Sequence, residues 1–106
     1  MDAAAAVIDL MQALPAGGEA WASLDVAETE IRRFRLRRMR GITANWHAHE
    51  AADEGFLVLS GEAVIDLDEE SRSLKAGEMT IIRAGRRHRA RVEGEALLLV
   101  FDTIEA

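Results

Sequence analysis

The stretch from Gly41 to Gly61, GITANWHAHEAADEGFLVLSG, constrains this chain more than any other part of it. His47 and His49 lie two residues apart, so on a β-strand both imidazoles would point to the same face of the sheet. Glu54 follows after a polar run that can turn the chain back and bring its carboxylate alongside them. Two neutral nitrogens and one carboxylate oxygen form half of a site for a divalent metal ion.

A second glycine-rich stretch carries the remaining histidine of the chain. It runs from Gly77 to His88, GEMTIIRAGRRH. The two histidines and the glutamate of the first stretch leave one ligand position open, and His88 is the remaining histidine that can fill it. The sequence therefore predicts one site for one divalent metal ion, with four ligands: His47, His49, Glu54 and His88.

The first stretch resembles the first motif of the cupin superfamily. That motif places a glycine, a His-x-His pair, a glutamate and a second glycine at set spacings. Gly41, His47, His49, Glu54 and Gly61 fill these positions. The spacing to Gly61 favours Glu54 over its neighbour Asp53 as the ligand.

The second stretch resembles the second cupin motif, with two departures. Gly77, Gly85 and His88 fall in register, whereas Arg83 stands where proline is expected and Val92 where asparagine is expected. The resemblance covers about residues 31–102 and is to small single-domain (cupin 2-like) bacterial cupins. It implies an all-β fold, a double-stranded β-helix or jelly-roll barrel with a short N-terminal helix, and a homodimer.

Local patterns place the expected elements. Ala-rich residues 3–14 predict a helix with Asp2 as its N-cap, followed by Pro15. We expect residues 1–18 to be helix and linker, and residues 19–106 to be one barrel domain of eight to ten short strands. These strands cover residues 19–24, 27–40, 55–59, 62–68, 71–75 and 78–83, with a hairpin of 88–92 and 95–101.

Two arginine clusters are candidates for binding an anion. Phe34, which we expect to face inward, shares strand parity with Arg38 and Arg40, whereas Arg33, Arg35 and Arg37 lie on the opposite face. Arg38 and Arg40 are therefore predicted to line the pocket; a solvated strand face is the alternative. In the family, residues near the second motif approach the open end of the barrel. The resemblance therefore adds Arg86 as a candidate for holding a carboxylate or phosphate.

Composition excludes several classes. The formal net charge of -6 argues against a general nucleic-acid-binding role. No apolar run approaches the roughly 20 residues that span a bilayer, so no membrane partner is expected. The N-terminus has acids where a secretory signal has basic residues, which favours a cytoplasmic protein. The chain has neither cysteine nor tyrosine, which removes thiolate and phenolic chemistry.

Two function classes remain. The first is a metal-dependent isomerase, lyase or dioxygenase that acts on a small carboxylated or phosphorylated molecule. The alternative is a non-catalytic cupin of unassigned role that binds or senses a small molecule through its metal. A metal-free structural dimer is a weaker third reading. Fe, Mn, Ni, Co, Cu and Zn are all compatible with the ligand set.

Overall fold

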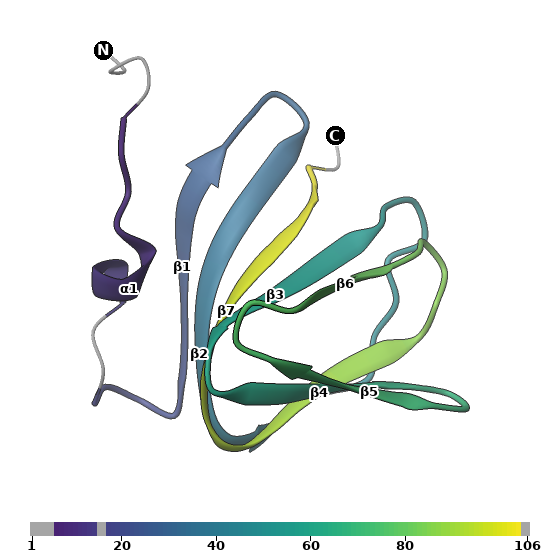
Figure 1. Cartoon of the computed structure of the whole chain (residues 1–106). Coiled ribbons are helices and arrows are strands. Elements are labelled where there is room, and N and C mark those ends of the chain that lie inside the picture. The colour runs from purple at the N-terminus through teal and green to yellow at the C-terminus, as the bar shows by residue number, and fades with distance from the viewer. Residues whose placement is uncertain (1–5, 15–16, 105–106) are drawn as a thin grey trace.

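The computed structural model describes residues 6–14 and 17–104, so the expected N-cap Asp2 and the helix-ending Pro15 lie outside the described residues. The described part is mostly antiparallel β-structure with one short helix (Figure 1). Its elements are α1 (Leu10–Ala13), β1 (Trp21–Glu28), β2 (Arg32–Thr43), β3 (Glu54–Ser60), β4 (Glu62–Leu67), β5 (Ser71–Lys75), β6 (Met79–Ile82) and β7 (His88–Thr103).

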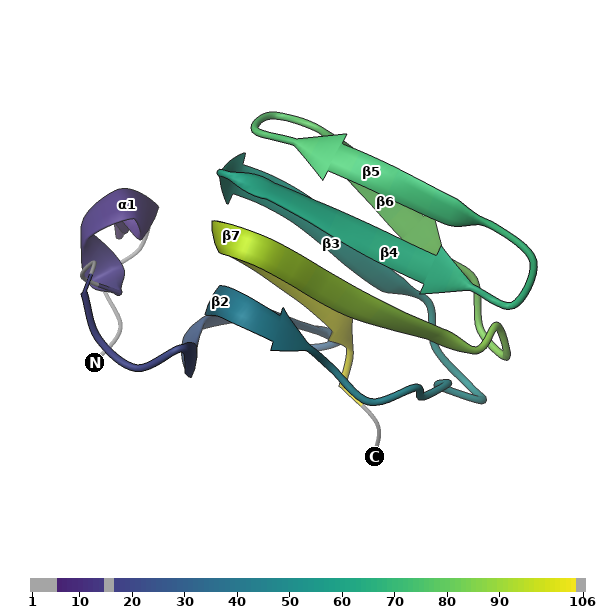
Figure 2. The same cartoon turned by 90° about the horizontal axis from the view of Figure 1, so that it is seen from below.

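The strands form two layers that share β7. One layer has the order β1-β2-β7-β3-β6, and in the other β4 pairs with β5 and with β7. In Figure 2, β5, β4, β7 and β2 lie next to one another, with β3 and β6 behind them. This arrangement confirms the expected double-stranded β-helix, or jelly roll, with a short N-terminal helix.

The strand β7 corrects the expected hairpin at Glu93 and Gly94. Residues 88–103 are one long strand instead of two paired ones. Its first part pairs with β4, from Leu67 opposite His88 onward, its second part pairs with β3, and β2 pairs with it from Arg91 to Thr103. A single bent strand therefore crosses both layers, which is why the described residues hold seven strands and not eight to ten.

The N-terminal part differs from expectation in extent. The helix α1 comprises a single turn, and Asp9 caps it by accepting a hydrogen bond from the backbone N–H of Met11. The first hairpin turns at residues 29–31, so β1 is longer and β2 starts later than the sequence predicts. Among the described residues, no helix is long and apolar enough to cross a membrane.

Strand alternation separates an inner from an outer face in the first layer. Phe56 and Val58 of β3 face inward as predicted and join the buried core with Met39 of β2. The outer face carries Phe34, which stacks on Phe101 of β7 at a ring-centroid distance of 6.0 Å. Phe34 therefore faces out, contrary to the expectation. Arg38 and Arg40, which share its parity, face out as well, and Arg35 and Arg37 face inward.

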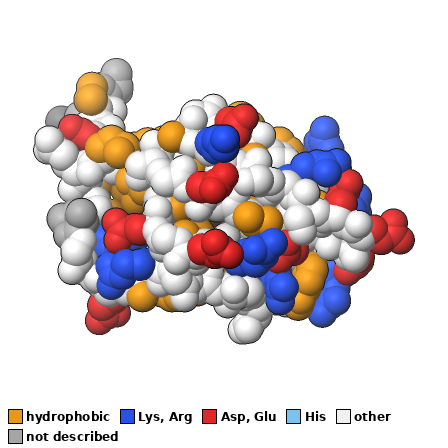
Figure 3. All heavy atoms as spheres, turned by 60° about the horizontal axis from the view of Figure 1, so that its bottom comes forward, with side chains coloured by type: hydrophobic (Ala, Val, Ile, Leu, Met, Phe, Trp, Pro, Cys, Tyr) orange, Lys and Arg blue, Asp and Glu red, His pale blue; other side chains and the backbone are white. Residues whose placement is uncertain are grey.

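The charged side chains of the second layer pair with one another. The buried carboxylate of Asp66 in β4 accepts hydrogen bonds from Arg89 and Arg91 of β7 and from Ser71 of β5. Basic and acidic side chains lie close together on the face in Figure 3. Arg89 and Arg91 thus serve to neutralise the buried Asp66.

Candidate metal centre

The two motifs meet at a backbone bridge between His47 and His88. The N–H of His47 donates to the carbonyl of His88 at 2.9 Å, and the N–H of His88 donates to the carbonyl of His47 at 2.8 Å. Apart from this isolated bridge, the His47-x-His49 segment lies outside the named strands, which differs from the strand that we expected. Both imidazoles nevertheless reach the site, because the bridge holds the segment against β7.

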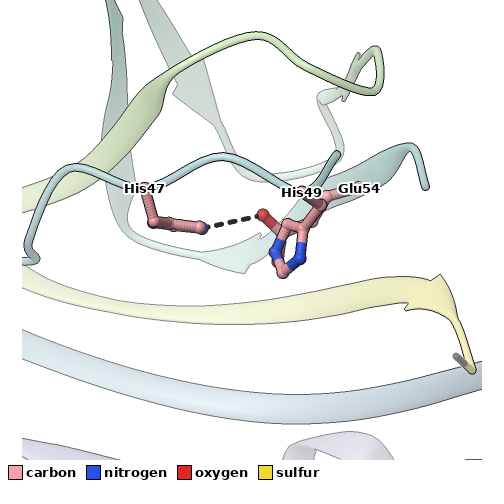
Figure 4. Close-up of side chains that lie close together, drawn as sticks. All are labelled: His47, His49 and Glu54. Carbon is pink, nitrogen blue, oxygen red and sulfur yellow. Dashed lines mark hydrogen bonds and ion pairs between the residues drawn. The ribbon is translucent and has the colours of Figure 1, made fainter. Parts of the chain in front are cut away.

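The carboxylate of Glu54 lies between the three imidazoles. Its Oε1 lies 3.1 Å from Nε2 of His47 and 2.7 Å from Nε2 of His88, and its Oε2 lies 3.4 Å from Nε2 of His49. In Figure 4, the side chains of His47 and His49 flank that of Glu54. One ligand atom from each of these three residues lies within 4.8 Å of the other two.

His88 is the deepest of the three histidines. Its side chain is 1% exposed, whereas those of His47 and His49 are 38% and 31% exposed. The ring centroid of His88 lies 4.3 Å from that of His47 and 6.3 Å from that of His49. The structure thus brings all four predicted residues together, with His47, His49 and Glu54 as the group whose ligand atoms are mutually close.

Two backbone carbonyls orient the imidazoles. Nδ1 of His88 lies 2.8 Å from the carbonyl oxygen of Arg86, and Nδ1 of His47 lies 3.2 Å from that of Asn45. A carbonyl holds the proton on Nδ1 of a neutral imidazole, so the lone pair falls on Nε2 once that atom gives up its hydrogen bond to Glu54. These contacts select the tautomer that a metal ligand requires.

The electrostatics keep Glu54 ionised. Burial by itself raises the pKa of this carboxyl, but hydrogen bonds from His88 and His47 and the nearby His49 outweigh it and lower the pKa to about 2. Burial lowers the pKa of His88, and the hydrogen bond to Glu54 reverses this, so that its pKa is raised. The site therefore presents an anionic oxygen among imidazoles at neutral pH.

The rival carboxylate, Asp53, has a different role. It accepts hydrogen bonds from the backbone N–H of Ala84 at 2.8 Å and from Nη1 of Arg83 at 3.1 Å. It thereby stabilises the turn at which the family pattern expects a proline. The N–H of Gly85 in that turn donates to the carbonyl of His49 at 2.8 Å, so the turn also helps to position a ligand residue.

The predicted anion-binding arginines lie away from the metal ligands. Nε of the buried Arg38 donates to the carbonyl of Glu19, and Arg40 contacts Glu95 and the carbonyl of Gly18. Both belong to the outer face of β2, because Phe34, with which they share parity, faces out. Arg86 contributes its backbone carbonyl to His88, while the residue also lines a separate pocket beside β5 and β6.

Arg35 and Arg37, on the opposite face of β2, are the arginines that reach the site. They line a pocket of about 310 Å³ together with six other residues: Trp21, Ala44, Asn45, His47, His49 and Glu54. Nη2 of Arg35 lies 3.9 Å from Oε2 of Glu54 and 3.0 Å from Oδ2 of the buried Asp102. The strand parity predicts two alternating sets of arginines, and the set that lines the pocket is Arg35 and Arg37 instead of Arg38 and Arg40.

The chemistry of the donor set fits a divalent metal ion. Three imidazole nitrogens and one carboxylate are ligands that Mn, Fe, Co, Ni, Cu and Zn accept. The Glu54 side chain is only 3% exposed and lies among the Nε2 atoms, which is a costly arrangement unless its charge is compensated. His47, His49, Glu54 and His88 would together hold such an ion.

The fold and the site together define a jelly-roll protein with a candidate metal centre inside the barrel. The family model described as "Cupin domain" matches residues 38–104. This chain therefore belongs to the cupin-domain family. A relative from Bacillus subtilis (strain 168), named Uncharacterized protein YdbB, is 38% identical over 74 residues. The match covers 69% of this chain and 65% of that protein, so the chain spans just under two thirds of its relative.

Solved structures show the same fold. TT1209 from Thermus thermophilus is 30% identical with a TM-score of 0.81, over 92% of this chain and 95% of that one. A cupin-2 domain-containing protein from Shewanella frigidimarina is 27% identical with a TM-score of 0.77, over 83% of this chain and 85% of that one. The expected membership among small cupins is thereby confirmed.

Proposed function

We propose that this cupin binds one divalent metal ion through His47, His49, Glu54 and His88 and uses it to act on a small anionic molecule. The observation that carries the proposal is the convergence of three Nε2 atoms on the Glu54 carboxylate. Imidazoles whose Nδ1 atoms face carbonyl groups are prepared to give their Nε2 lone pairs to a metal.

The surrounding residues indicate what the site accepts. Glu54 supplies one negative charge toward a divalent ion, so the occupied site keeps a positive charge. Arg35 and Arg37 add positive charge on the same side of β2. Such a pocket favours a small molecule with carboxylate or phosphate groups.

The metal would supply Lewis acidity toward a bound oxygen, or oxygen chemistry if it is iron. The protein's own contribution is to place the anion. Asp102 holds Arg35 in position through the 3.0 Å contact, and the ring of the buried Phe56 meets that of His88 edge to face, with the centroids 5.8 Å apart. An isomerase, lyase or dioxygenase is the proposed class.

A non-catalytic cupin that binds or senses a small molecule through its metal is the second candidate. The observation that favours it is the scarcity of acid or base groups: of the described residues that line the pocket, Glu54 is the single carboxylate. Turnover of carboxylated or phosphorylated compounds by the metal-loaded protein supports the enzyme, and saturable binding without turnover supports the binding module.

The first experiment is elemental analysis of the protein purified without added metal or chelator. We expect about one equivalent of a divalent metal in the parent protein and a loss of that metal in His49→Ala. Glu50→Ala, which removes an exposed acid from the same segment, is the matched control and should retain the metal. The identity of the metal then selects the assay: oxygen consumption for iron, and isomerase or lyase activity for the others.

No metal in any of these proteins, and none taken up on titration with Fe²⁺, Mn²⁺, Ni²⁺, Co²⁺, Cu²⁺ or Zn²⁺, would contradict the proposal. That result would leave a metal-free cupin with a binding or structural role.

The homodimer stays a prediction of the family resemblance. It is supported by apolar side chains on the outer face of the first layer, where Phe34, Leu57, Leu99 and Phe101 are only partly buried. Light scattering on the protein as it elutes from a size-exclusion column should give twice the mass of one chain. The boundary between the helix and linker (residues 1–18) and the barrel domain (residues 19–106) likewise stays a prediction. So does the cytoplasmic location.

A further inference from the structure

The arginines of this chain differ in how their charge is compensated. Eight of the described arginines form ion pairs with carboxylates: Arg33, Arg35, Arg40, Arg72, Arg83, Arg87, Arg89 and Arg91. Arg37 forms no ion pair with a described carboxylate. Its guanidinium instead lies over the indole ring of Trp21, 4.7 Å from the ring centroid.

The charge of Arg37 is also partly withdrawn from water without a carboxylate to compensate it. Its side chain is partly buried, and its Nε, like those of Arg33 and Arg35, is buried without a hydrogen-bond partner among the described residues. Arg33 and Arg35 are paired with Asp102, whereas Arg37 has no ion pair with a described carboxylate. Burial lowers its pKa, and the neighbouring Arg35 lowers it further, although Glu54 and Asp102 act in the opposite direction. A partly buried guanidinium without a carboxylate partner carries a charge that a bound anion would compensate.

Trp21 and Arg37 face the metal ligands. The register of β1 and β2 places Trp21 opposite Met39 and Ser23 opposite Arg37, on the inner face of the layer. Both Trp21 and Arg37 line the pocket that also contains His47 and His49. The indole covers one side of the guanidinium, so the N–H groups along the guanidinium edge stay available to a ligand in the pocket.

We propose that Arg37, held by Trp21, binds one anionic group of a small dianionic ligand whose second group faces the metal ligands. This inference rests on the proposed function and specifies its substrate class. The chemistry required is a dicarboxylate or a phosphorylated small molecule, since a planar guanidinium binds either group through two N–H donors. Arg35 is less suited to this role, because its guanidinium already forms an ion pair with Asp102.

The test uses the full chain loaded with Zn²⁺ and two probe anions, malonate and inorganic phosphate. Binding is measured by isothermal titration calorimetry on the parent, on Arg37→Gln and on Arg40→Gln. Arg40 lies on the same strand but on its outer face, so its replacement is the matched control. We expect Arg37→Gln to weaken binding about tenfold or more, as for loss of a hydrogen bond between charged groups, and Arg40→Gln to change it less than about twofold.

A second readout does not depend on the Arg37 variant folding. The chain has two tryptophans, so Trp46→Phe leaves Trp21 as the sole indole. An anion that engages Arg37 changes the environment of that ring, and we expect a saturable change in its fluorescence at the concentrations that calorimetry reports. Tighter binding of malonate identifies dicarboxylates as the class, and tighter binding of phosphate identifies phosphorylated compounds.

Metal content is measured first on every variant. Absence of metal uptake by the parent contradicts the proposed function. Full metal content with no binding of either anion, or with equal affinity in the parent and in Arg37→Gln, overturns the present inference alone. An unchanged Trp21 fluorescence at saturating anion overturns it as well.

Discussion

Nε2 of His88 lies 2.7 Å from Oε1 of Glu54, although the two residues are 34 positions apart in the chain. It is the shortest contact between an imidazole and this carboxylate, and both partners are almost fully buried. The contact joins the second motif to the first. The long pairing of β7 with β3 and β4 is what brings these positions together.

Replacing Glu54 by glutamine tests whether metal binding needs the negative charge of this side chain or only its size. The amide has the size of the carboxylate but supplies no negative charge to a divalent ion. We expect metal affinity to fall about 100-fold or more in Glu54→Gln, because loss of a direct ligand should cost at least as much as loss of an outer contact of a metal site. Competition with a chelator measures it. Glu50→Gln, an exposed acid nearby, serves as the control; equal affinities in the two variants would exclude Glu54 as a ligand.

Metal binding should stabilise the fold. A ligand at 100 times its Kd adds about 2.7 kcal/mol to the free energy of unfolding. For a domain of this size we expect Zn²⁺ to raise Tm by roughly 10 °C or more. Differential scanning calorimetry measures the shift. His49→Ala should show a much smaller shift, and an equal shift in that variant would mean that the ion binds elsewhere.

Two glycines with left-handed backbones test the tight turns between strands. Gly61 has a φ of 78° and Gly77 a φ of 87°. A Cβ at Gly61 would collide with the backbone of Glu95 and Ala96, whereas at Gly77 no atom lies within 4 Å. Gly77→Ala should cost about 1–2 kcal/mol from its backbone conformation alone. Gly61→Ala should cost at least about 2 kcal/mol more, because a collision is added.

Denaturant unfolding measures both glycine variants. Equal destabilisation in the two would show that the neighbouring strand gives way, and that the close approach at Gly61 does not matter to the fold.

Asp66 should govern part of the acid stability. Burial raises its pKa, but hydrogen bonds from Arg91, Ser71 and Arg89 outweigh it and lower the pKa from 3.8 to about 2. A carboxyl with a depressed folded-state pKa stabilises the protein above its unfolded pKa. That contribution is lost as the pH falls from about 4 through about 2.

We therefore expect Asp66→Asn to lower the free energy of unfolding by about 1–2 kcal/mol at neutral pH and to flatten its decline between pH values of about 4 and about 2. Denaturant unfolding at several pH values measures it. Asp68→Asn is the control, because Asp68 is exposed and its contact with Arg87 is long, at 3.8 Å. A parallel decline in Asp66→Asn and the parent would contradict the assignment.

The candidate ligands were predictable from the sequence because they are local signals. His47 and His49 are two residues apart in the chain, and set spacings relate Glu54 and His88 to glycines that must turn. The role of Asp53 was not predictable in the same way. Its partners, Arg83 and Ala84, lie 30 and 31 residues away, and only the folded chain brings them into contact.

The sequence by itself determined the cupin fold, the four converging residues and the existence of two alternating sets of arginines on β2. Only the tertiary structure decided which set faces the pocket. A period of two residues states that Arg35 and Arg37 oppose Arg38 and Arg40, but not which side is the inside. The packing of Met39 into the core between the layers settles that choice, because it leaves Phe34 stacked on Phe101 outside and Arg37 beside Trp21 within.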